Sequence, residues 1–186
     1  MRRFLLAGAL VLGLTFASGC QLRAQEHPVP VAEPTSEASG SPTAEPPRTQ
    51  SVTVYLIRGE RLVAVVRNVE PGTDRLTSAL HALVRGMDAA ERHQELRSSV
   101  PLDTVTPVWR VESGGLGVEL PITFDGLDTR DQVLAVAQVV YTVTENGDTN
   151  RVAFTRDDNP VDVPDADGRL LTRPVTRADY GRFAPR

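Results

Sequence analysis

The stretch from Gln132 to Thr144 constrains the fold more than any other part of the chain, because nearly all of its residues are aliphatic. Its many valines and its alternation would suit a buried strand, which is the alternative interpretation. On a helix, however, Gln138, Thr142 and Glu145 fall within one narrow window and everything else is apolar or alanine. Either structure must be buried over most of its surface.

The ends of this stretch favour the helix. Thr129 and Gln132 form a T-x-x-Q pattern that predicts a capping box at the start. The pair Asn146-Gly147 predicts a stop at the other end. The run is also longer than an average strand. We therefore predict a helix here.

The chain before this helix alternates between strand and helix signals. Residues 52–57 and 62–69 are rich in β-branched and apolar residues and predict two strands of a hairpin. Asp74 precedes leucines that share one helix face, and Gly86 suits the end of that helix. Asp88 and Glu91 then predict a capping box for a short second turn.

Three more extended segments complete the pattern. Residues 100–112 and 116–124 flank a Gly-Gly turn and predict a second hairpin, and residues 150–155 predict a final strand. The order is strand–strand–helix–strand–strand–helix–strand. It predicts an α+β fold: a two-layer sandwich in which two main helices lie on one face of a small mixed or antiparallel sheet.

The N-terminus has the features of a lipoprotein signal peptide. Two arginines precede an apolar run from Phe4 to Phe16, and the small residues Ala17-Ser18-Gly19 precede Cys20. Cys20 is the only cysteine, which excludes an internal disulfide, and its thiol can accept a diacylglycerol. We predict that residues 1–19 are removed by cleavage between Gly19 and Cys20. The alternative is an ordinary secretory signal in which Cys20 is incidental.

Residues 20–50 are predicted to be a tether. Prolines recur among Ser, Thr, Glu and Ala, and such a segment has too little apolar surface to fold. We place the folded domain at residues 51–163 and an arginine-rich tail at residues 164–186. Tyr180 and Phe183 favour a tail that docks on the domain; the alternative is a tail that binds an anionic surface.

Four segments carry a family resemblance by their order and spacing: Val54-Tyr55-Leu56, Ala79 to Gly86, Leu96 to Pro101 and Gln138 to Thr142. Together they resemble the GerMN (sporulation and spore germination) domain of bacterial envelope lipoproteins. The resemblance is to such lipoproteins of the high-GC Gram-positive type; the chain has arginine but no lysine, for which codon bias in a GC-rich genome is the plainest explanation. It implies a fold similar to ring-building motifs, contacts with other proteins, and no active site. The residues that carry it most clearly are Tyr55, Leu80, Leu83, Gly86, Pro101, Gln138, Tyr141 and Thr142.

Signals for chemistry are weak elsewhere. The pI near 5.4 argues against a nucleic-acid partner, and no phosphate-binding or nucleophile motif occurs, so we predict no cofactor and no catalytic residue. Asp158, Asp165 and Asp167 are weak calcium candidates, because the loop lacks a full ligand set. Glu112 and Glu119, placed across the predicted second hairpin, are the only acid pair that a wall hydrolase could use.

These features predict a non-enzymatic lipoprotein held by diacylglycerol at the outer face of the cytoplasmic membrane. Its partners would be unidentified envelope or membrane proteins, in envelope assembly, signalling, or sporulation and germination, and a homo-oligomer is a further option. The alternative is an extracytoplasmic binding protein for calcium, cell-wall fragments or a small ligand.

Overall fold

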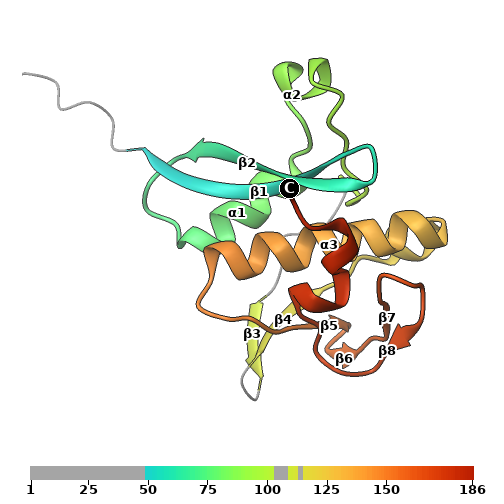
Figure 1. Ribbon diagram of the computed structural model, residues 1–186. Coiled ribbons are helices and arrows are strands. Elements are labelled where there is room, and N and C mark those ends of the chain that lie inside the picture. The colour runs from blue at the N-terminus through green and yellow to red at the C-terminus, as the bar shows by residue number, and fades with distance from the viewer. Residues whose placement is uncertain (1–48, 103–108, 113–114) are drawn as a thin grey trace, which may run out of the picture. The chain divides into compact units, whose positions relative to one another are not determined.

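The computed structural model describes residues 49–102, 109–112 and 115–186, all of which lie in one compact unit, Ala44–Arg186. Figure 1 shows the arrangement of its elements. In chain order these are β1 (Gln50–Arg58), β2 (Arg61–Val69), α1 (Arg75–Val84), α2 (Ala89–His93), β3 (Trp109–Glu112), β4 (Gly115–Glu119), η1 (Ile122–Gly126), α3 (Thr129–Asn146), β5 (Val152–Arg156), β6 (Asn159–Pro160), β7 (Val163–Pro164), β8 (Leu170–Leu171) and η2 (Arg177–Phe183).

The first hairpin forms as predicted. β1 and β2 pair antiparallel from Gln50↔Val69 to Arg58↔Arg61 without a bulge. Gly59 takes a positive φ of 60° in the turn, a conformation that glycine adopts at no steric cost. β1 begins at Gln50, which is the last residue of the predicted tether.

The predicted signals at the ends of α1 and α2 are confirmed. The Asp74 carboxylate accepts hydrogen bonds from the N–H groups of Leu76 and Thr77 and so caps α1. Gly86 follows the end of α1 with φ +82°, the left-handed conformation that suits this position. Asp88 and Glu91 form the reciprocal capping box of α2.

The aliphatic stretch is a helix, α3, and the strand interpretation is wrong. Its predicted cap is also wrong by one residue, because Asp128 is the N-cap and accepts from Asp131 N–H at 2.8 Å. The Gln132 amide instead donates to the carbonyl oxygen of Phe124, at 3.4 Å. Gly147 ends the helix, as expected.

The second hairpin belongs to a mixed sheet of order β3-β4-β5-β6. β3 and β4 are antiparallel, and β4 and β5 are parallel with α3 as their crossover. The strand predicted to reach Phe124 ends at Glu119, and η1 follows Pro121. Proline has no N–H to donate to a sheet, which explains the early end.

Beyond β6, the described residues add two more short strands, β7 and β8, and the 3-10 helix η2. β7 pairs with β8, and Val175 forms a backbone bridge to Val152 of β5. Tyr180 is 0% exposed and its hydroxyl donates to the Pro164 carbonyl at 2.7 Å. The C-terminal residues therefore contribute to the same core as the rest of the domain.

The fold class is α+β, as predicted. Among the described residues the strands form three small sheets, β1-β2, β3-β4-β5-β6 and β7-β8, where the sequence predicted a single one. α3 contacts β1, α1, β5 and β7, so it occupies the centre of the core. Its leucine, valines and alanines are almost fully buried on several sides, which explains its nearly uniform apolar composition.

Candidate functional site

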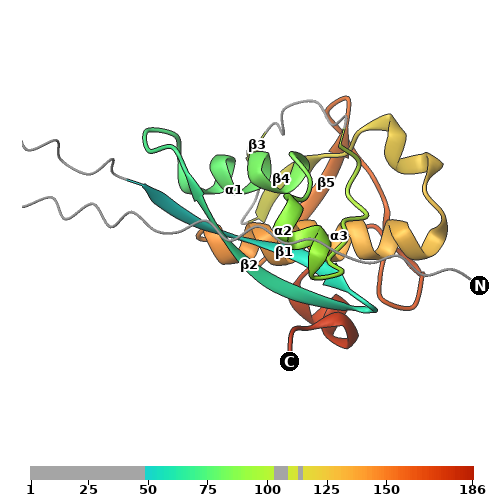
Figure 2. The ribbon, with the colours of Figure 1, turned by 90° about the horizontal axis from the view of Figure 1, so that it is seen from above.

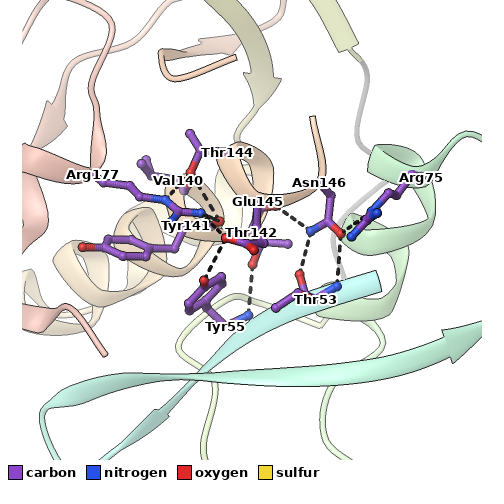
Figure 3. Close-up of polar contacts among 10 residues, drawn as sticks. All are labelled: Thr53, Tyr55, Arg75, Val140, Tyr141, Thr142, Thr144, Glu145, Asn146 and Arg177. Carbon is purple, nitrogen blue, oxygen red and sulfur yellow. Dashed lines mark hydrogen bonds and ion pairs between the residues drawn. The ribbon is translucent and has the colours of Figure 1, made fainter. Parts of the chain in front are cut away.

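A row of polar side chains on α3 contacts the outer edge of β1, the edge away from β2 (Figure 3). Gln138, Thr142 and Asn146 follow one another at intervals of four and so share a helix face. The Thr142 hydroxyl accepts from Tyr55 N–H at 3.1 Å, and the Gln138 amide donates to Tyr55 C=O at 2.8 Å. Asn146 accepts from Thr53 N–H at 3.1 Å and donates to its C=O at 2.6 Å. These side chains take the place of a neighbouring strand.

The same edge is completed by backbone further along. Ile57 and Arg97 exchange two N–H to C=O hydrogen bonds of 2.8 Å each. The Gln138 side-chain oxygen also accepts from Ser99 N–H at 2.8 Å. Gln138 is 0% exposed, and its hydrogen bonds are what make a buried polar residue tolerable there. Gln138 and Thr142, singled out by the resemblance, thus have a structural use.

Tyr55 and Tyr141, two more residues from the resemblance, form an aromatic cluster closed by the C-terminal segment (Figure 3). Their rings meet edge to face at a centroid distance of 5.3 Å. The Arg177 guanidinium lies 4.9 Å from the Tyr141 ring centroid and 5.6 Å from that of Tyr55. Arg177 also donates to Glu145 at 2.7 Å, and the Tyr55 hydroxyl donates to the same carboxylate oxygen at 3.1 Å.

The charges in this cluster stabilise one protonation state. The hydrogen bond from Arg177 lowers the pKa of Glu145 below its ordinary value, and the Tyr55 hydroxyl adds to this effect. Burial raises the pKa of Tyr55 and of Tyr141. At neutral pH the cluster therefore holds a carboxylate, two neutral phenols and a guanidinium, a set that suits binding of η2 rather than proton transfer.

The remaining residues from the resemblance belong to the core. Leu80 and Leu83 are almost fully buried, and Pro101 lies with them beside an apolar cavity of about 30 Å³. A Cβ on Gly86 would stand 2.9 Å from a Leu102 methyl group, and the positive φ would strain it further.

The aspartates proposed for calcium have other contacts. Asp158 lies at positive φ in the turn between β5 and β6, and Asp165 and Asp167 lie between β7 and β8. The Asp165 carboxylate accepts from the N–H groups of Asp167 and Arg169, and Asp167 pairs with Arg182 at 3.4 Å. Within the part of the chain that the structure describes, no three His, Cys, Asp or Glu side chains are grouped to hold a metal.

The acid pair considered for a hydrolase is not assembled. In the β3–β4 register Glu112 is opposite Gly115, so Glu119 lies at the far end of the hairpin from it. The Glu119 carboxylate accepts from the Thr155 hydroxyl at 2.8 Å and from Asp157 N–H at 2.6 Å. That carboxylate therefore fixes the end of β5 beside β4.

The lipidation and cleavage residues, Cys20 and Gly19, lie outside the described residues. No helix in the described ranges is both long and apolar enough to cross a bilayer.

The sequence did not predict one surface, which consists of the outer edge of β2, away from β1, and the hollow beside it. Val66 is 69% exposed on this strand, and β2 has β1 as its only sheet neighbour among the described strands. The hollow, which we name the β2 groove, has a volume of about 640 Å³ and is lined by Val65, Arg67, Met87, Ala90 and Glu91, among others. Hydrophobic alternation in 62–69 is the only sequence signal here, and it does not tell which edge of a strand is paired.

Arg67 forms a wall of the β2 groove. Its guanidinium makes two hydrogen bonds to Glu91, of 2.8 and 2.6 Å, and donates to the carbonyl oxygens of Ala82 and Gly86. The Arg67 and Glu91 side chains are only 15% and 6% exposed. This buried ion pair joins the face of β2 to α2 and the end of α1.

Comparisons with known proteins agree with this fold. A family model described as "Sporulation and spore germination" (Germane) matches residues 42–162. The first GerMN domain of the sporulation protein GerM from Bacillus subtilis is 18% identical, over 70% of this chain and 99% of that one, with a TM-score of 0.52.

The tandem GerMN domains of the same Bacillus subtilis protein are 19% identical, over 67% of this chain and 47% of that one, with a TM-score of 0.49. This chain thus spans about half of the tandem structure. No curated protein matches. The matched family is not a known enzyme class. Because its model covers well over half of the sequence, the chain belongs to the sporulation and spore germination family, and its folded part is a GerMN-type domain.

Proposed function

We propose that this chain is a membrane-anchored, non-enzymatic envelope lipoprotein whose GerMN-type domain acts by binding other proteins. A diacylglycerol on Cys20 would hold it at the outer face of the cytoplasmic membrane. Its process would be envelope assembly, signalling, or sporulation and germination, as membership of the family suggests.

The observation that carries the interaction role is the contrast between the motif residues and the β2 edge. The polar groups of Gln138, Thr142 and Tyr55 make hydrogen bonds to other residues inside the domain. The outer edge of β2 instead has no strand neighbour among the described residues, and the exposed Val66 side chain lies there beside the β2 groove. A free strand edge next to a groove suits the addition of a strand from another protein.

The anchor is supported by the sequence around Cys20. The full chain should be expressed in a Gram-positive host with an alkyne fatty acid, beside a Cys20→Ala variant. We expect label and membrane association for the parent and loss of both in the variant. A parent protein that is unlabelled and free in the culture medium would overturn the anchor.

The interaction role calls for a second experiment. A photoreactive amino acid should be placed at Val66 of the full chain in cells, with the same residue at Ile122 as control, because Ile122 is 71% exposed but lies on η1. We expect protein adducts from position 66 and few from position 122. Equal yields at the two positions would contradict a specific interface on β2.

A further inference from the structure

The register of the first hairpin determines which backbone groups face outward on β2. Thr53 and Tyr55 direct their N–H and C=O groups away from β2, to side chains of α3. In an antiparallel pair, residues that face each other without exchanging hydrogen bonds both direct their backbone outward. Their partners across the hairpin, Val66 and Ala64, therefore direct these groups to the outer edge of β2. Figure 2 shows the hairpin from above, and among the described strands only β1 pairs with β2.

A second hollow adjoins the β2 groove. It has a volume of about 410 Å³ and is lined by the end of β2, the loop that follows and one side of α1. The α1 residues in its lining are Ser78, His81 and Arg85. Asn68 of β2 and Arg85 line both this hollow and the β2 groove, so the two hollows meet at these residues. An extended segment that pairs with β2 therefore lies beside both.

The charged side chains around the two hollows differ in what they contact. Arg67 and Glu91 form the buried ion pair, and the Asp88 carboxylate caps α2 by accepting from Glu91 N–H at 2.8 Å. Glu70 follows β2 and lines only the second hollow. Arg85 is exposed, lines both hollows, and its guanidinium has no hydrogen bond or ion pair with any residue that the structure describes. Arg85 is thus the charge best placed to meet a segment on β2.

The lining of the hollows changes along β2. Side chains of an added strand alternate between its two faces, and those of one face are directed into the hollows. Near Val65 these side chains meet an apolar part of the β2 groove, which includes Met87 and Ala90. Near Asn68 they meet the side of α1 that carries Arg85. The surface therefore suits a segment in which an apolar and an acidic side chain share one strand face.

We propose that an extended segment of another protein pairs with the outer edge of β2 and places an acidic side chain against Arg85, with an apolar side chain of the same strand face in the β2 groove. This inference rests on the proposed interaction role and names the chemistry of the partner. Backbone hydrogen bonds to β2 supply affinity for any extended segment. The pairing of the acid with Arg85 supplies selectivity, because a basic residue there meets a like charge.

The test measures binding of two dye-labelled peptides with blocked ends to the purified full chain in detergent, by fluorescence anisotropy. One peptide is STVTETVTS, whose pattern is the same in both strand directions, and the other has glutamine in place of glutamate. We expect the glutamate peptide to bind about three- to tenfold more tightly, because its carboxylate pairs with a guanidinium. Arg85→Gln should remove this difference. Arg151→Gln, which changes another exposed arginine, should leave it intact.

Three results would overturn the inference: equal affinity of the parent for the two peptides, a difference that survives Arg85→Gln, and failure of both peptides to bind. Because Arg85 is exposed, the Arg85→Gln variant should fold as the parent does, and its circular dichroism spectrum checks this. The photoreactive residue at position 66 separates these outcomes from failure of the proposed function. Protein adducts there without a preference for the glutamate peptide would refute the acidic partner alone. Equal adduct yields from positions 66 and 122 would refute the interface itself.

Discussion

The two outer edges of the β1–β2 hairpin differ in what covers them. The outer edge of β1 is hydrogen-bonded by Gln138, Thr142 and Asn146 of α3 and by the backbone of Arg97. The outer edge of β2 has no strand neighbour among the described residues, and the Arg67–Glu91 ion pair holds the face of the strand. In this domain a helix closes the outer edge of β1. The outer edge of β2 is therefore the one that remains available for a partner.

The largest expected effect concerns the ion pair behind the open edge. Glu91→Ala leaves the Arg67 guanidinium buried without its carboxylate and should lower the free energy of unfolding by about 3–5 kcal/mol. Denaturant unfolding of the variant beside Asp148→Ala, which removes an exposed acid, measures this effect. A loss no greater than that of the control would mean that β2 does not depend on this contact.

The protected edge should be almost as sensitive. Gln138→Leu keeps the volume but leaves Tyr55 C=O and Ser99 N–H without partners, which should cost about 2–4 kcal/mol in unfolding free energy. The control is Gln132→Leu on the same helix, where the residue is half-buried and makes one long hydrogen bond. Similar losses in the two variants would show that the helix does not stabilise the β1 edge as described.

The smallest effect involves acid and the cluster next to β1. Because the hydrogen bond from Arg177 lowers the folded-state pKa of Glu145 below its ordinary value of 4.5, its contribution to stability is present at neutral pH and is lost as the pH falls through the lowered pKa. The Arg177–Glu145 pair is more than one-third exposed, so about 0–1 kcal/mol is expected. Glu145→Gln should be less stable than the parent at pH 7, and the difference should shrink as the pH is lowered into the acid range. A constant difference across this range would contradict the assignment.

Local signals predicted much of the secondary structure. Asp74 and the Asp88–Glu91 box act within a few residues of themselves, so their caps could be predicted from spacing alone. The cap of α3 could not, because Asp128 and Thr129 are both good N-cap residues. The path of the chain out of η1 selects Asp128 and turns Gln132 toward Phe124.

The candidate surface was less predictable than the fold. The resemblance identified Tyr55, Gln138 and Thr142 as important residues, but only the structure shows that their polar groups are directed inward, to β1 and α3. Val66 looked like any other residue of an alternating strand. Its exposure depends on which neighbours the sheet lacks, and that is a property of the whole domain.

The amino-acid sequence alone determined the elements whose signals are local: the first hairpin, the caps of α1 and α2, and an aliphatic segment that had to be buried. Tertiary structure decided how the strands divide among sheets and which strand edge stays open. The physical reason is that backbone donors and acceptors can be satisfied by any suitable group that reaches them. Whether a helix side chain, another strand or solvent does so depends on packing between residues far apart in the chain.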